Sequence, residues 1–254
     1  MQLSACIEWQ FEEAGEGLPE RIRAASAAGL ELAEFHLWRD KDLAGVAEAV
    51  AETGVKLTGF CVDPRRSIVD PAEHDAMLSA VADTIAEAKK LGSPPLIIAS
   101  GFRVEGMSEE EHFQQAVSVL KRAAALAEEA GVTLMLEPLN TELFATMYLV
   151  DTKLGLDLVE AVGSHRLKLL YDAYHSRVMG EDIREVLAGR MHLVEHVQVA
   201  GWPGRNEPGT GDFDYADVMQ ALDELGYKGP LGLEYFPTRP TVESIQLARE
   251  AMGV

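Results

Sequence analysis

The 254-residue sequence contains few cysteines and no long apolar run. Cys6 and Cys61 are its only cysteines, and both lie within apolar segments. This excludes a disulfide scaffold and indicates two buried thiols in a reducing compartment. No apolar stretch approaches the length of about 18 residues that a membrane span needs, and no basic segment precedes a long apolar one. We therefore expect a cytoplasmic protein with no signal peptide and no membrane partner.

Positive charge is also scarce. The sequence has 22 Lys and Arg against 42 Asp and Glu, which gives a formal net charge of -20. A chain this acidic repels phosphate backbones, so we expect no nucleic-acid partner. The simplest role of the charge is to keep the protein soluble. Apolar residues make up 47% of the chain, which is enough for a sizeable core.

Eight short apolar segments alternate with segments of helical periodicity. The expected strands cover residues 3–9, 30–38, 55–62 and 94–100, and four later strands end at Glu137, Asp172, Gln198 and Glu234. The expected helices cover residues 18–28, 43–53, 70–91, 108–130, 154–162, 183–188, 214–225 and 241–252. Capping boxes that begin at Asp70 and Ser108 indicate two of the helix starts.

This alternation predicts an α/β fold. Short, almost continuously apolar strands are typical of a parallel sheet covered on both faces. Eight β/α units in about 250 residues match the size of a TIM barrel, so we predict one (β/α)8 domain over residues 1–254. An open, doubly wound sheet would need a glycine-rich loop after the first strand. The sequence has Gln10-Phe11-Glu12-Glu13 there instead.

The four polar residues at the later strand ends indicate a metal site. In a TIM barrel the strand C-termini open on one face, so Glu137, Asp172 and Glu234 should converge with Gln198. Three carboxylates brought together repel one another, and a divalent cation relieves that repulsion. An all-oxygen set of ligands suits Mg2+ or Mn2+ better than Zn2+. Each acid taken alone would be read as an ordinary residue near a loop, and the four in register at consecutive strand ends favour the metal site.

Further polar residues near the strand ends are candidates for substrate binding. His175 follows Asp172 closely and could bind a substrate hydroxyl or carbonyl, or could serve only to cap a loop. Arg205 could hold a substrate carboxylate or hydroxyl, or could pair with Glu207 and order the loop that both occupy. His36 could line the barrel mouth or be a core histidine. We predict His175, Arg205, Glu207 and His36 as substrate-binding residues.

Four segments resemble hydroxypyruvate isomerases of the xylose isomerase-like TIM-barrel superfamily. They are Leu136–Asn140 (LEPLN), Tyr171–His175 (YDAYH), His196–Gln198 with Pro203–Gly211 (HVQ and PGRNEPGTG), and Gly232–Tyr235 (GLEY). The match is specific over residues 133–237. The chain departs from the pattern in two loops that shape the pocket. Residues 141–147 replace a Pro-Gly-aromatic turn, and residues 36–39 also differ.

The resemblance implies a mechanism and roles for the candidate residues. Glu137, Asp172, Gln198 and Glu234 would bind the metal, and the two glutamates would also act as acid and base. His175 and Arg205 would contact the substrate. The expected enzyme is an isomerase of a small hydroxy-carbonyl compound, hydroxypyruvate-like or a ketose, that works through an enediolate.

Several alternatives remain open at this point. The same metal site would also serve a ketose 3-epimerase or a sugar lyase. A sugar-binding barrel without catalysis and a nuclease of the same superfamily are two further readings. The nuclease would need additional histidine ligands and a basic groove. Apolar stripes on the outer helices lead us to expect a homo-oligomer.

Overall fold

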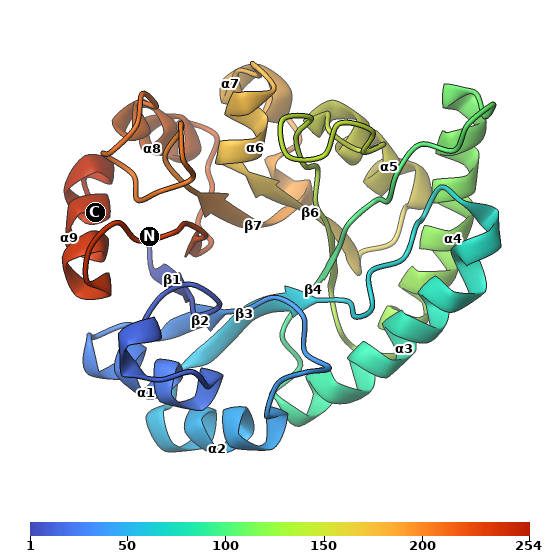
Figure 1. Ribbon diagram of the computed structural model, residues 1–254. Helices are drawn as coiled ribbons and strands as arrows, with labels where there is room; N and C mark the ends of the chain where they lie inside the picture. The colour runs from blue at the N-terminus through green and yellow to red at the C-terminus, as the bar shows by residue number, and fades with distance from the viewer.

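The computed structural model describes residues 1–254 and contains a closed barrel of eight parallel strands. Neighbouring strands in the chain are also neighbours in the barrel, and β8 pairs with β1 to close it. Figure 1 shows the strands at the centre of the molecule with helices around them. The predicted (β/α)8 fold is confirmed. The strands are β1 (Leu3–Cys6), β2 (Leu32–Glu34), β3 (Lys56–Cys61), β4 (Leu96–Ile98), β5 (Leu134–Leu136), β6 (Leu167–Asp172), β7 (Val194–Val199) and β8 (Leu231–Leu233).

Two helices, rather than the predicted one, lie between β6 and β7. The side chain of Asp172 accepts a hydrogen bond from the backbone N–H of Tyr174 and so begins α6 directly after the strand. The helices are α1 (Leu18–Ala27), α2 (Leu43–Thr53), α3 (His74–Lys90), α4 (Glu109–Ala130), α5 (Thr152–Val162), α6 (Ala173–Val178), α7 (Ile183–Leu187), α8 (Tyr215–Glu224) and α9 (Thr241–Met252). Short 3-10 helices cover Glu12–Ala14, Pro71–Glu73 and Met191–Leu193.

The first two strands are shorter than predicted because apolar side chains continue into buried loops. β1 stops at Cys6, and the chain then turns, with Phe11 in the left-handed backbone region at φ 61°. Ile7, Phe11 and Phe35 lie in these loops and are nevertheless buried. An apolar run therefore marks burial here without marking strand structure.

The two predicted capping boxes behave differently. Ser108 and Glu111 form the reciprocal pair of side-chain to backbone hydrogen bonds at the start of α4. Asp70 instead caps the 3-10 turn that precedes α3. The Glu73 carboxylate accepts from the backbone N–H of Ser67 rather than from that of the cap residue. The predicted capping box at Asp70 is therefore wrong, because the carboxylate of Glu73 binds the preceding loop instead.

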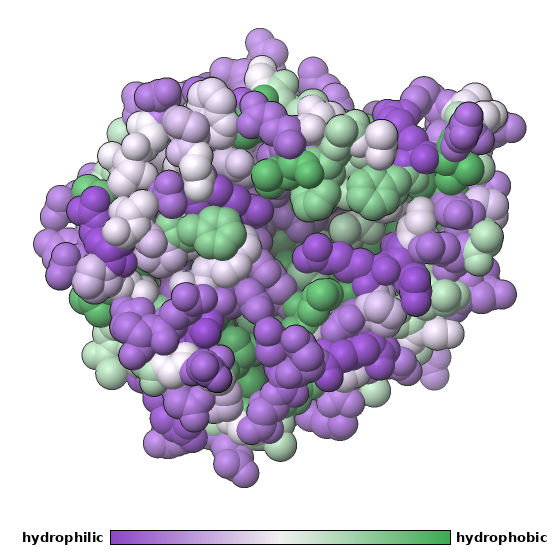
Figure 2. Space-filling model, viewed as in Figure 1, coloured by the Kyte–Doolittle hydropathy of each residue, from purple (hydrophilic) through white to green (hydrophobic).

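Most of the core is one large cluster of buried apolar side chains, and a second, small cluster consists of Cys61, Ile97, Met135 and Leu170. None of the helices is both long and apolar enough to cross a bilayer. Figure 2 shows a mostly hydrophilic surface on which apolar side chains gather around a hollow near the middle of the view. The barrel thus supplies a rigid frame on which loops can form a pocket.

The capping box of α4 gives a test of the local structure. Ser108→Ala removes the side-chain acceptor for the Glu111 N–H, so the free energy of unfolding should fall by about 1 kcal/mol. Urea unfolding followed by circular dichroism measures this. Ser79→Ala is the matched control, because Ser79 bonds only to the carbonyl of Asp75 within a helix. An equal loss in both variants would contradict the capping role.

Candidate active site

The four predicted metal ligands lie at consecutive strand ends. Glu137 follows β5, Asp172 ends β6 and Glu234 follows β8. Gln198 is the register partner of Asp172 on β7, and its own partner on β8 is Gly232, two residues before Glu234. All four side chains are buried. The sequence order of the barrel therefore brings these groups to one part of the barrel mouth.

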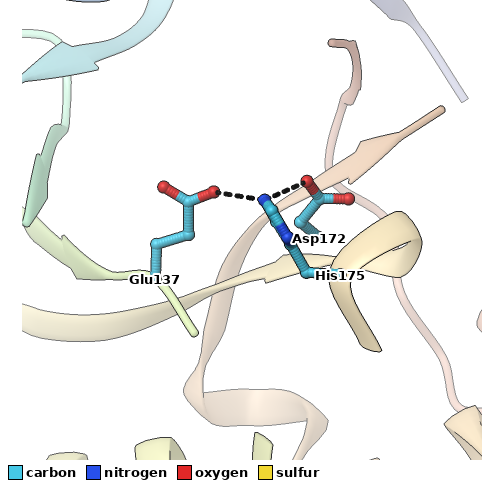
Figure 3. Close-up of side chains that lie close together, drawn as sticks. All are labelled: Glu137, Asp172 and His175. Atoms are coloured by element: carbon cyan, nitrogen blue, oxygen red, sulfur yellow. Dashed lines mark ion pairs between the residues drawn. The ribbon is translucent and has the colours of Figure 1, made fainter. Parts of the chain in front are cut away.

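His175 lies between two of the carboxylates (Figure 3). Its Nε2 is 3.4 Å from Oδ2 of Asp172 and 3.8 Å from Oε1 of Glu137. The other ring nitrogen, Nδ1, is 2.8 Å from Nδ2 of Asn140. The Asn140 amide oxygen accepts from the N–H of Leu143, which orients the amide so that Nδ2 faces the ring.

The contact with Asn140 decides where the imidazole proton sits. Because the amide nitrogen donates, Nδ1 must accept, and a neutral ring then carries its proton on Nε2. Burial, followed by the charge of Arg205, lowers the pKa of His175 to about 3, which keeps the ring neutral. The geometry would allow Glu137, Asp172 and His175 to hold a metal ion together. The protonated Nε2 instead makes His175 a hydrogen-bond donor.

Arg205 is the cation among the carboxylates. Its Nη2 donates a short hydrogen bond to Oε2 of Glu234 and lies 3.4 Å from Oδ2 of Asp172. The guanidinium also lies over the rings of Trp9 and Tyr174, at 5.2 and 5.1 Å from their centroids. Arg205 therefore faces the site from the long loop after β7, as predicted.

Glu207 lies away from this group. It is fully buried, and its carboxylate accepts from the N–H and hydroxyl of Thr238 and from Nε of Arg239. The anticipated pair with Arg205 does not form. Because both oxygens of Glu207 bind the loop after β8, the structure corrects its predicted place beside the substrate residues. His36 does reach the site, and its Nε2 is 2.8 Å from Oε1 of Glu234.

The carboxyl groups titrate very differently. Burial raises the pKa of Glu137 well above its usual value, and the charges of Glu234 and Asp172 raise it further. Burial also raises the pKa of Asp172 to about 7, although Arg205 opposes the shift. For Glu234 the attraction of Arg205 and the hydrogen bond from His36 outweigh burial and lower the pKa to about 2. The nearby positive charge thus offsets burial fully at Glu234 and only in part at Asp172 and Glu137.

Gln198 provides a test of whether the residues fit a metal ion. Its Nε2 donates to Oε1 of Glu34 at 2.8 Å, which leaves its Oε1 buried without a hydrogen-bond partner. An unpartnered amide oxygen beside carboxylates is a suitable ligand for a hard cation. The donor set therefore fits a divalent cation.

Glu34 is a buried residue that the sequence did not reveal as part of the site. It lies on β2 and accepts from Gln198, from Nε2 of His196 at 2.7 Å and from Oγ1 of Thr58 at 3.0 Å. Gly232 leaves room for it, because a Cβ there would lie 2.5 Å from a Glu34 oxygen. A lone glutamate within an apolar run carries no signal for such a role.

Several of these polar groups line a pocket of about 200 Å3, here named the strand-end pocket. Its lining includes Trp9, His36, Glu137, His175, Arg205 and Glu234. Arg65 and Cys61 also line it and were not predicted as site residues. Asn140 was part of a quoted motif, but only its contact with His175 shows what it does. Exposed arginines such as Arg65 have no distinguishing sequence pattern.

The chain belongs to the xylose isomerase-like TIM-barrel family, whose model matches residues 22–253. Among its relatives is a provisionally assigned hydroxypyruvate isomerase from Streptomyces coelicolor, 34% identical, with 87% of this chain and 86% of the relative covered. The hydroxypyruvate isomerase of Escherichia coli is 26% identical over 87% of this chain and 88% of its own. A crystal structure of an AP endonuclease, family 2, from Brucella melitensis superposes with a TM-score of 0.88 at 25% identity, covering 96% of each chain.

The predicted tautomer of His175 can be measured directly. In the metal-free protein, nitrogen-detected NMR should show a protonated Nε2 and an unprotonated Nδ1. The signals should stay constant between pH 5 and 8, because the lowered pKa keeps the ring neutral throughout that range. A ring that gains a second proton in this range would contradict the assignment. Asn140→Ala should release the tautomer preference, because Nδ1 then loses its donor.

Proposed function

We propose that this protein is a metal-dependent isomerase of small hydroxy-carbonyl compounds, with hydroxypyruvate as the first substrate to test. Its curated relatives make it an isomerase. The observation that best supports a metal ion and this mechanism is the set of three buried carboxylates near the Gln198 amide oxygen, which has no hydrogen-bond partner. A strand-end pocket of about 200 Å3 suits a substrate of a few carbons.

The proposed cofactor is one divalent ion, Mn2+ or Mg2+. Glu137, Asp172, Gln198 and Glu234 are the residues that would hold it. Bound there, it would supply the Lewis acidity that stabilises the negative charge of an enediolate. The ion would also relieve the repulsion that raises the pKa of Glu137.

The two glutamates are the proposed acid and base. The surroundings lower the pKa of Glu234 to about 2, mainly through Arg205 and against the effect of burial, whereas burial and the charges of Glu234 and Asp172 raise the pKa of Glu137. Environments that separate two carboxyl pKa values in this way are typical of paired general acids and bases. One glutamate removes the proton from the carbon next to the carbonyl, and the other returns a proton to the neighbouring carbon.

His175 and Arg205 complete the proposed site. The Nε2–H of His175 points between the carboxylates and can donate to a substrate oxygen. Arg205 is held by acidic and aromatic side chains at the edge of the same pocket. Trp9 packs on His36 and Phe236 and forms part of the wall of the pocket.

Epimerisation is the second candidate, because the same enediolate can be reprotonated on its other face. A lyase would use that intermediate to expel a neighbouring substituent. The structural likeness to a protein described as an AP endonuclease makes a nuclease another candidate function for this chain. The net charge of -20 weighs against a protein that holds a phosphate backbone. We also retain the proposal that the chain self-associates.

Substitutions separate ligands from bases. Glu137→Gln and Glu234→Gln keep an oxygen but remove the base, so turnover should fall by about 100-fold or more even at saturating Mn2+. Asp172→Asn should instead weaken metal binding, so that high Mn2+ restores part of the rate. Initial rates measured against Mn2+ concentration distinguish the two effects. If Mn2+ rescues Glu234→Gln as fully as Asp172→Asn, the two-glutamate mechanism is wrong.

The metal requirement and the reaction can be tested together. Adding Mn2+ should raise the melting temperature, because a ligand that binds only the folded state stabilises it. Hydroxypyruvate in D2O should then exchange its hydroxymethyl protons, which proton NMR detects whatever the final product is. Exchange that persists after exhaustive chelation would contradict the metal requirement. Exchange of ketohexoses alone would favour the epimerase.

A further inference from the structure

A second cavity lies beside the strand-end pocket and plays no part in the proposed mechanism. It encloses about 470 Å3 and is here named the side cavity. Arg65, Ala99, Leu139 and Phe144 line both spaces, so the two meet along this wall. The site as a whole is therefore larger than a three-carbon substrate needs.

The segment in which the sequence departs from the isomerase pattern forms part of the side cavity. Residues 141–147 run beside the loop after β4, and Met147 forms an antiparallel bridge with Phe102. The N–H of Arg103 donates to the carbonyl of Thr146 at 2.9 Å, which ties the two loops together. Phe144 and Met147 then contribute apolar lining. The departure therefore changes the shape of the space next to the strand-end pocket.

Most charged groups of the side cavity already have partners. Asp70 accepts from the N–H of Ala72, and Glu73 accepts from that of Ser67. Arg103 pairs with Glu109. These contacts hold the loops around the side cavity in place.

Arg65 differs from them in its partners. No carboxylate lies within 4.0 Å of its guanidinium, and its polar contact is Nη2 to Sγ of Cys61 at 3.8 Å. The other arginine of the strand-end pocket, Arg205, is engaged by Glu234 and Asp172. Arg65 is thus the arginine of the strand-end pocket that remains free to bind an anion.

We propose that Arg65 binds an anionic group of the substrate where the strand-end pocket meets the side cavity. That group lies on the far side of the carbonyl from the reacting hydroxymethyl carbon. This proposal rests on the proposed function for the position of the carbonyl. An anion beside Glu137 and Glu234 is repelled, and a planar guanidinium offsets that repulsion while binding carboxylate or phosphate through two hydrogen bonds.

Two sources of the anionic group share this chemistry. Hydroxypyruvate carries a carboxylate next to its carbonyl, and dihydroxyacetone phosphate carries a phosphate one carbon further away. Dihydroxyacetone has the same hydroxy-ketone group and no charge. The side cavity gives room for the bulkier phosphate, so comparing the three compounds identifies the source.

Binding of an unreactive pair tests Arg65 without any need for turnover. Glycerate carries a carboxylate where glycerol carries a hydroxymethyl group. Calorimetry with the Mn2+-supplemented protein measures the ratio of their affinities. In Arg65→Gln this ratio should fall by about 10- to 100-fold, the usual range for a hydrogen bond to a charged group. Arg66→Gln is the matched control, because Arg66 lines the side cavity but not the strand-end pocket.

The control must keep the wild-type ratio, and Arg65→Lys should keep part of it. Equal affinity of the wild type for glycerate and glycerol would overturn the proposal, as would equal losses in the two glutamine variants. Melting temperatures measured on the same samples show whether Arg65→Gln is folded, and Arg65→Met replaces it in the comparison if it is not.

Isotope exchange in D2O distinguishes failure of this proposal from failure of the proposed function. In Arg65→Gln, kcat/KM for the preferred anionic compound should fall by about 10- to 100-fold relative to dihydroxyacetone. An unchanged ratio would overturn the role of Arg65 even if the protein is an isomerase. If none of the three compounds exchanges in the wild type, the proposed function fails. The glycerate comparison still decides whether Arg65 binds an anion.

Discussion

Three carboxylates buried at one end of a barrel require positive charge, and the arrangement of the site depends on this requirement. Glu137, Asp172 and Glu234 lie together because each stands at the end of a parallel strand and these strands all end on one face. Arg205 compensates Glu234 most strongly and leaves the pKa of Glu137 raised. A bound divalent ion would complete the compensation, which is why charge balance and the proposed chemistry point to the same residues.

Hydrogen bonds behind the site fix the orientation of the groups that face the substrate. Glu34 can only accept from Gln198, so the amide must turn its oxygen away from Glu34. Asn140 similarly donates to Nδ1 of His175, so the proton of the neutral ring must lie on Nε2. Both supporting residues are buried and lie on other elements than the groups they orient. Glu34 is on β2 and Gln198 on β7, whereas Asn140 follows β5 and His175 is in α6. The barrel therefore determines which atom each side chain presents, as well as where that side chain lies.

The sequence predicted much of this organisation because strand ends are visible as apolar runs that stop at polar residues. Asp172 ends β6 as expected, and Thr241–Met252 is α9 as predicted. Helix α6 was not predicted because it starts directly after β6, and Asp172 is both the last residue of the strand and the cap of the helix. Contacts across the barrel, such as that of Glu34 with Gln198, join residues far apart in sequence. No local pattern could indicate them, and Glu207 was misplaced for the same reason.

The proposed metal site can be tested by a crystal structure of the Mn2+-loaded protein, with anomalous diffraction measured near the manganese absorption edge. We expect one strong anomalous peak per chain, surrounded by oxygen atoms of Glu137, Asp172, Gln198 and Glu234. The His175 ring should stay hydrogen-bonded to Asn140 and should not bind the ion. A peak bound by His175 Nε2 without Gln198, or no peak at this barrel mouth, would show that the proposed ligand set is wrong.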